Sequence, residues 1–246
     1  MGLEMLNPPS ITGIKKALFI APHPDDNEIG AGGLMARLVA QGVEVYGMCV
    51  TDDRSVCPKS EWKDGLTVRQ NEQLAALSEL GAKSAGFLGF DDKTSATVEQ
   101  ISDALVERIR ELKPDAVFSV DPTLTNECHR DHLKVGQAVR MAVMDAVCNF
   151  YPYGKPSDPW KVEVLGQYFT AEPNVIVDIT NFAEKKISAM KKHVSQMDPE
   201  LLGAIELQGR LFGKQGGVKH GEALKLYSFF HLHCFNLPIN KIKKAI

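Results

Sequence analysis

Two short runs of the sequence combine histidine and aspartate in a way that suits metal chemistry. Residues 23–26 read His-Pro-Asp-Asp, and residues 129–132 read His-Arg-Asp-His. Imidazole nitrogens and carboxylate oxygens are ligands of Zn²⁺, and a catalytic zinc site keeps one tetrahedral position open for water. A His and an Asp three residues apart, with a His from a distant loop, supply three ligands. We therefore predict a metal site formed by His23, Asp26 and His132.

The remaining polar residues of the two runs have predicted roles beside the metal. Adjacent side chains point apart, so Asp25 is expected to leave ligation to its neighbour and to take a proton from the metal-activated water as general base. His129 precedes His132 by one helical turn, and when protonated it would stabilise an oxyanion. Asp131 is the expected partner that holds a histidine ring in place.

The elements that must position these residues alternate between strand and helix up to about residue 150. Short apolar runs predict strands, and stretches with helical spacing of apolar residues follow them. This order predicts an α/β fold, a Rossmann-like three-layer α/β/α sandwich with a mostly parallel sheet over residues 15–150. The expected strands are 16–21, 43–51, 85–90 and 116–120, and the expected helices are 28–41, 67–80, 98–112 and 132–148.

The polar clusters follow the first, second and fourth of these strands. In open parallel sheets, ligands bind outside the carboxyl ends of the strands, so the clusters are expected to meet at one edge. Beyond residue 150 the pattern changes to a proline-rich loop, two further strands (162–169 and 174–180) and two helices (181–196 and 199–215). We interpret 151–246 as a C-terminal elaboration of one domain that spans 1–246.

The same residues carry a resemblance to the PIG-L/LmbE-like family of N-deacetylases. Residues 21–30, Ala-Pro-His-Pro-Asp-Asp-Asn-Glu-Ile-Gly, followed by Gly32 and Gly33, look like the opening motif of the family, and residues 129–132 look like its second motif. Further matches lie at Arg69-x-x-Glu72, at Phe90-Asp-Asp92, at 175–180, at Lys186 and at 193–196. The resemblance covers about residues 15–196, and the nearest variety is the N-acetylglucosamine and diacetylchitobiose deacetylases.

This resemblance implies an activity, a cofactor and a set of site residues. It implies removal of an N-acetyl group from an N-acetylglucosamine-like amino sugar or its conjugate. One Zn²⁺ per chain would be held by His23, Asp26 and His132, and Fe²⁺ or Co²⁺ could occupy the same ligands. Asp25 would be the base and His129 would lie at the oxyanion, while Arg69 and Asp92 would contact the substrate. Related proteins form trimers or hexamers, so a homo-oligomer is expected.

One segment departs from the family pattern. The family carries an aromatic-x-Glu-aromatic stretch after its last helix, whereas residues 219–224 here read Lys-His-Gly-Glu-Ala-Leu. Leu224 stands where the second aromatic residue is expected. Because that region shapes the substrate pocket or the subunit contacts, the substrate is less well defined by the sequence than the metal chemistry.

Composition excludes several other classes of function. The formal net charge is −3 and no long basic run occurs, which argues against a nucleic-acid partner. No apolar run of 18 residues occurs, so we expect no membrane span. The five cysteines are scattered without CxxC spacing, which indicates free thiols in a cytoplasmic protein.

Two alternative functions use the same residues differently. In a sugar-nucleotide glycosyltransferase, Asp52-Asp53 or Asp25-Asp26 would hold Mg²⁺ or Mn²⁺, although Mg²⁺ prefers oxygen ligands and the two histidines count against it. In a non-catalytic Rossmann-like sugar-binding module, a base at Asp25 would be unnecessary.

Several further residues have a functional and a structural interpretation. His220, His231 and His233 form a C-terminal cluster that could bind a metal but also fits ordinary packing. Trp62, Tyr151, Tyr153 and Trp160 could stack on sugar rings or pack under loops. Gly30, Gly32 and Gly33 resemble part of a dinucleotide fingerprint, but their place inside a helix favours close packing of that helix on the sheet.

Overall fold

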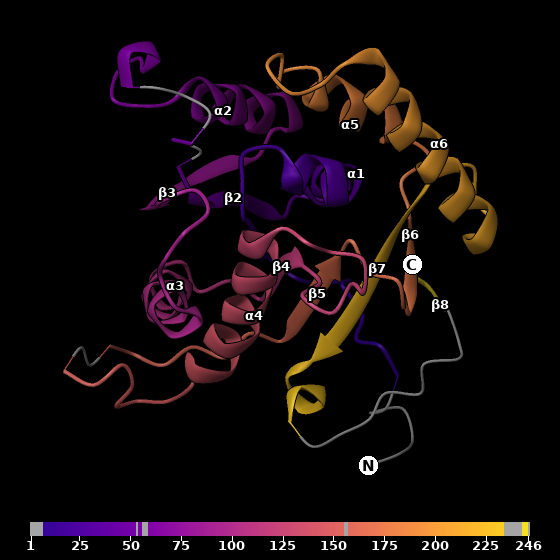
Figure 1. Cartoon of the computed structure of the whole chain (residues 1–246). Coiled ribbons are helices and arrows are strands. Elements are labelled where there is room, and N and C mark those ends of the chain that lie inside the picture. Colours follow the sequence, from indigo (N-terminus) through magenta and orange to yellow (C-terminus); the bar gives the residue numbers. More distant parts are fainter. Residues whose placement is uncertain (1–6, 53, 56–58, 155–156, 234–242, 246) are drawn as a thin grey trace.

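The computed structural model describes residues 7–52, 54–55, 59–154, 157–233 and 243–245. They form an eight-stranded sheet in the order β3-β2-β1-β4-β5-β7-β6-β8 (Figure 1). β1 pairs in parallel with β2 and β4, and β2–β3 and β4–β5 are also parallel, whereas β7 runs antiparallel to β5 and β6. The strands are β1 (Lys16–Ala21), β2 (Glu44–Thr51), β3 (Lys83–Phe90), β4 (Ala116–Val120), β5 (Val164–Tyr168), β6 (Val175–Asp178), β7 (Gly221–Ser228) and β8 (Lys243–Ala245).

Helices cover both faces of the sheet and make three layers (Figure 1). Alternate residues of β1 divide between two buried clusters: Phe19 belongs to the cluster with α1, α2 and α5, and Leu18 to the cluster with α3 and α4. The fold class expected from the sequence is therefore confirmed. The helices are α1 (Asp26–Ala40), α2 (Val68–Leu80), α3 (Val98–Leu112), α4 (Arg130–Asp145), α5 (Ala183–Met190) and α6 (Pro199–Gly216), with the 3₁₀ turns η2 (Lys59–Glu61) and η3 (Phe229–Leu232).

Two expected helices have wrong bounds, and one strand was not predicted. α4 begins at Arg130 because His129 occupies its N-cap, and it ends at Asp145, short of Cys148. α5 is shorter than the expected 181–196 and ends at Met190, after which 191–197 forms turns. β7 was not predicted, because the Gly-Glu-Ala-Leu-Lys-Leu run that begins at Gly221 has no clear alternation of polar and apolar residues.

The glycines at the start of α1 allow the helix to lie very close to the sheet. A Cβ at Gly30 would stand 2.1 Å from Cδ2 of Tyr168, and one at Gly33 would stand 2.7 Å from Cδ1 of Ile179. Close packing, rather than dinucleotide binding, accounts for these residues, as the sequence favoured. No helix among the described residues is long and apolar enough to cross a membrane.

Candidate active site

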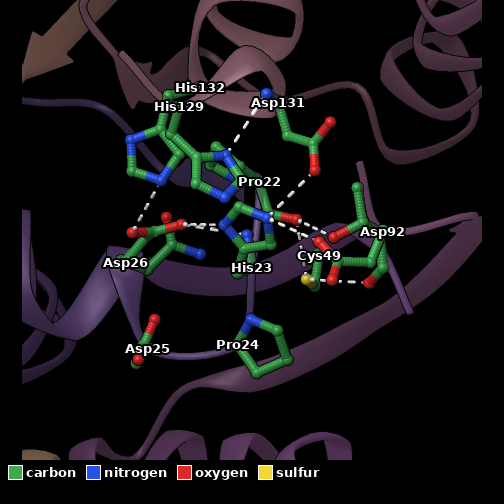
Figure 2. Close-up of polar contacts among 12 residues, drawn as sticks. Pro22, His23, Pro24, Asp25, Asp26, Cys49, Asp92, His129, Asp131 and His132 are labelled. Atoms are coloured by element: carbon green, nitrogen blue, oxygen red, sulfur yellow. Dashed lines mark hydrogen bonds and ion pairs between the residues drawn. The ribbon is translucent and has the colours of Figure 1, made fainter. Parts of the chain in front are cut away.

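The two His/Asp runs meet at the carboxyl edge of the sheet, as predicted. Residues 23–26 lie in the turn that leads from β1 into α1, and residues 129–132 form the N-terminus of α4, which follows β4 and its loop. Asp92 reaches the same place from the end of β3 (Figure 2). The backbone of this edge is tied together where Thr51, the last residue of β2, donates both its N–H and its hydroxyl to the carbonyl of Pro22.

Three imidazole rings form the centre of the site. The ring centroids of His23 and His129 are 4.5 Å apart, and those of His129 and His132 are 5.2 Å apart. Ligand atoms of all three lie within 4.8 Å of one another, and a second group of this kind contains His23, Asp92, His129 and Asp131. The arrangement can therefore hold a metal ion.

Asp26 connects two of these rings. Its Oδ2 lies 3.4 Å from Nδ1 of His23, and its Oδ1 lies 3.4 Å from Nε2 of His132. Although burial opposes ionisation, hydrogen bonds from His132 and His23 hold the pKa of Asp26 well below its usual value. The carboxylate is therefore charged inside the protein and requires positive charge beside it.

The other ring nitrogen of His23 forms a hydrogen bond with Asp131. Nε2 of His23 lies 3.2 Å from Oδ2 of Asp131. The carboxylate of Asp131 is completely buried, and it also accepts hydrogen bonds from the backbone N–H of Lys93 at Oδ2 (2.8 Å) and from that of Thr94 at Oδ1 (3.0 Å). Burial opposes protonation of His23, but its hydrogen bonds to Asp131 and Asp26 prevail and raise its pKa to about 10. Burial also lowers the pKa of His132, but its hydrogen bond to Asp26 outweighs burial, and the pKa is raised above its usual value.

Asp25 behaves differently from its neighbour. It occupies the N-cap position of α1, but its side chain makes no capping hydrogen bond, so the ordinary structural explanation for an aspartate there does not apply. Oδ2 of Asp25 instead lies 3.1 Å from Nη2 of Arg69, and the two neighbouring carboxylates have different partners. Burial and the nearby charge of Asp26 raise the pKa of Asp25 to about 7, against the opposing effects of Arg69 and His193.

His129 and His132 share a support that the sequence analysis missed. Glu127 accepts a hydrogen bond from the backbone N–H of His129 at 2.7 Å, and its Oε2 lies 2.9 Å from Nδ1 of His132. It precedes α4 in a loop, where no spacing rule marks it. Nδ1 of His129 accepts the backbone N–H of Asp131 at 3.4 Å, which leaves Nε2 of a neutral ring to carry the proton. Burial and the nearby His23 and His132 lower the pKa of His129, so the expected protonation is not favoured here.

Cavities flank the histidines on two sides. One of about 350 Å³ is lined by polar side chains: His23, Ser55, Arg69, Asp92, Lys93 and His129. Another of about 380 Å³ reaches from Asp26 and His132 towards α6, where Phe169, Ile205 and Phe212 make part of its wall. Asp92 contributes to the first cavity while its Oδ1 lies 3.4 Å from Nε2 of His23 and its Oδ2 accepts from Ser55.

Several of the other candidate residues have contacts of their own. Among the described residues, neither group of potential metal ligands includes His220, His231 or His233. Asp52 pairs with Arg54, while Asp53 lies outside the described residues. The indole of Trp160 donates to the carbonyl of Pro114 at 2.7 Å, which indicates packing under its loop.

Comparison with known proteins agrees with this geometry. The family model described as PIG-L, GlcNAc-PI de-N-acetylase, matches residues 18–143. The chain belongs to the PIG-L family. It is 30% identical over 230 residues to diacetylchitobiose deacetylase of Thermococcus kodakarensis, covering 89% of this chain and 86% of that protein. The probable N-acetyl-alpha-D-glucosaminyl L-malate deacetylase 2 of Bacillus cereus is 29% identical, covering 76% and 86%.

A solved structure matches most of the fold. The N,N'-diacetylchitobiose deacetylase of Pyrococcus horikoshii, in complex with an inhibitor, superimposes with a TM-score of 0.83 at 27% identity, covering 96% of this chain and 91% of that one. The family resemblance inferred from the two His/Asp runs is thus confirmed. Neither the glycosyltransferase nor the non-catalytic binding module finds support, because these relatives are deacetylases.

Proposed function

We propose that this protein is a zinc-dependent hydrolase that removes the N-acetyl group from an N-acetylglucosamine-like amino sugar or its conjugate. The observation that carries the proposal is the meeting of His23, Asp26 and His132 beside a buried Asp25, in a chain that belongs to a family of deacetylases. Relatives named for deacetylation of chitobiose and of a glucosaminyl malate support an amino-sugar substrate.

The residues present fit a zinc ion. Ligand atoms about 2.0–2.1 Å from a tetrahedral zinc lie about 3.4 Å from one another. Asp26 lies at this distance from both of its imidazole partners, through Oδ2 to Nδ1 of His23 and through Oδ1 to Nε2 of His132, each at 3.4 Å. We assign His23, Asp26 and His132 as ligands, with Asp131 and Glu127 as the partners that orient the two rings. Fe²⁺ or Co²⁺ could use the same donors, and two imidazoles with one carboxylate are also a ligand set of catalytic zinc in hydrolases.

The chemistry divides between the metal and the chain. A zinc ion in this site would lower the pKa of a water molecule and polarise the substrate carbonyl. Asp25 takes the proton of the attacking water and then delivers it to the departing amine. A carboxyl group whose pKa is raised to about 7 suits both transfers near neutral pH. The Nε2–H of neutral His129 donates to the oxygen that becomes negative during attack.

The polar cavity is the proposed place of the sugar. Asp92 can accept hydrogen bonds from hydroxyl groups there, and Arg69 can donate to the sugar while it holds the carboxylate of Asp25. The substitution of leucine for an aromatic residue at 224 affects neither contact. Leu224 belongs to β7 and is fully buried in the cluster that packs against α1, α2 and α5, whereas its neighbours Glu222 and Ala223 line the second cavity.

The assignment is tested by metal content and acetate release measured on one preparation. Protein purified without chelator is expected to contain zinc and to release acetate from N-acetylglucosamine or N,N'-diacetylchitobiose. Removal of the metal should abolish the release, and added zinc should restore it. Protein that has no bound metal, or that keeps full activity after metal removal, would contradict the proposal.

We also propose a cellular location, an oligomeric state and a domain organisation for the enzyme. Among the described residues, Cys49, Cys128 and Cys148 form no disulfide, which supports a reducing cytoplasmic location. Leu201, Leu207 and Leu211 of α6 are exposed, which supports a homo-oligomer that covers this helix, and sedimentation velocity would detect a chain that stays monomeric. We treat the chain as one domain.

A further inference from the structure

The backbone of Asp25 has a conformation that needs support from its surroundings. Its φ is 117° and its ψ is −30°, in a region that residues other than glycine rarely adopt. Residues held in such conformations persist only where the surrounding structure fixes them, and they gather at active sites. The first turn of α1 does not fix the side chain, since Asp25 makes no capping hydrogen bond.

A chain of buried side chains leads from Asp25 into the interior. The backbone N–H of Asp25 donates to Oε1 of Gln73 at 3.0 Å, and Nε2 of Gln73 donates to Oε1 of Glu28 at 2.8 Å. Oε2 of Glu28 lies 3.4 Å from Nε2 of His193. Gln73 is 4% exposed, and Glu28 and His193 are completely buried.

Glu28 determines which way the amide of Gln73 points. A carboxylate only accepts hydrogen bonds, so it must face the NH₂ group of the glutamine. The carbonyl oxygen of Gln73 is then left for the N–H of Asp25. His193, which follows α5, is the last member of this chain of contacts. Its ring faces the second oxygen of Glu28, and a buried carboxylate needs such a polar partner.

Helix α2 therefore holds Asp25 at two points. Arg69 lies one helical turn before Gln73 and donates to the Asp25 carboxylate at 3.1 Å and to the Pro24 carbonyl at 2.9 Å. Gln73 holds the backbone N–H of the same residue. We infer that Gln73, oriented by Glu28 with His193 behind it, is a positioning residue that keeps Asp25 in the geometry required for proton transfer. The inference rests on the proposed function, in which Asp25 is the base.

The test compares two buried glutamines of α2. Gln73→Met removes the hydrogen bonds at nearly constant length, and Gln70→Met does the same to a glutamine that is 5% exposed and serves the N-terminal capping box of the helix. For acetate release from N,N'-diacetylchitobiose, Gln73→Met is expected to lower kcat by about 10- to 100-fold, because small displacements of catalytic groups cost that much. KM and bound zinc should stay near the parent values, and Gln70→Met should lower the melting temperature while kcat stays close to that of the parent.

A second pair of variants remains informative if Gln73→Met does not fold. Gln73→Glu places two carboxylates in contact and is expected to lower kcat. The double variant Gln73→Glu with Glu28→Gln exchanges amide and carboxylate, so both hydrogen bonds can form again. It should recover about tenfold in kcat over Gln73→Glu, which is a coupling typical of residues in contact.

The outcomes separate this inference from the proposed function. Asp25→Asn is measured in the same series. If Asp25→Asn is inactive while Gln73→Met keeps the parental kcat, the positioning role is wrong and the base assignment stands. Equal losses of kcat in Gln73→Met and Gln70→Met, or loss of zinc from Gln73→Met, would also overturn it. Full activity in Asp25→Asn would overturn the base assignment itself.

Discussion

Asp131 shows how single buried residues build this site. It is completely buried and collects three donors: the ring of His23 and the backbone N–H groups of Lys93 and Thr94. Although burial opposes ionisation, His23 and these N–H groups hold the pKa of Asp131 below its usual value. The carboxylate therefore fixes the ring of a proposed metal ligand and also ties the loop after β3 to α4.

Asp131→Asn is expected to weaken zinc binding by about 10- to 100-fold, the usual effect of removing a partner of a ligating histidine. The asparagine keeps the shape of the side chain, but its NH₂ group must face one of the three donors. Zinc affinity measured by competition with a chromophoric chelator checks the prediction. Asp145→Asn, at the other end of α4, is the matched control and should bind zinc like the parent. Equal affinity in both variants would show that Asp131 does not support the metal site.

At the scale of elements, α1 is two helical segments joined by a break. Ala31 has φ −147° and ψ 19°, and the carboxylate of Glu222 accepts the N–H groups of Gly33 and Leu34 at 2.8 and 2.7 Å. Nζ of Lys186 connects the first helical segment to Glu222, because it donates to the Ile29 carbonyl and to Oε1 of Glu222, each at 2.7 Å. An anion at the start of the second segment also meets the positive end of its dipole.

Removal of Glu222 is therefore expected to be more harmful than removal of Lys186. Glu222→Gln leaves a buried ammonium group without its carboxylate, and we expect a loss of about 3–5 kcal/mol in the free energy of unfolding. Lys186→Met leaves Glu222 with two N–H donors and should cost less. Urea denaturation of both variants and of the double variant measures the difference and the coupling.

Lys185→Met is the control for this pair. Lys185 is the neighbour of Lys186 on α5, but its ion pair with Glu79 is partly exposed at 3.3 Å, and such pairs contribute below about 1 kcal/mol. If Lys185→Met costs as much as Glu222→Gln, the break in α1 is not stabilised by the buried pair.

For the whole molecule, the sequence predicted the parallel part of the fold and the edge at which the site lies. Apolar runs such as 16–21 and 116–120 predict strands because both of their faces are buried. The two His/Asp runs follow the ends of β1 and β4, which are neighbours in the sheet, so their meeting could be predicted from topology.

The supports of the site could not be predicted in the same way. Gln73 and Glu222 act through contacts with residues 48 and 189 positions away in sequence, so their roles depend on tertiary distances that neither periodicity nor capping rules mark. Glu127 acts on His129 and His132, 2 and 5 positions further along, but it lies in an irregular loop where no spacing rule applies. β7 was missed because its first four residues are buried on both faces of the sheet, and a strand covered on both faces needs no alternating pattern.

Asp25 is proposed to transfer protons beside a metal that other residues hold, so its replacement should stop catalysis and leave the metal bound. Asp25→Asn is the suitable variant, because asparagine tolerates a positive φ better than most residues. Zinc content and acetate release are measured on the same preparation. We expect about one zinc per chain, as in the parent, with kcat lower by about 10²- to 10⁴-fold. Parental kcat in Asp25→Asn with zinc in place would contradict this role of Asp25.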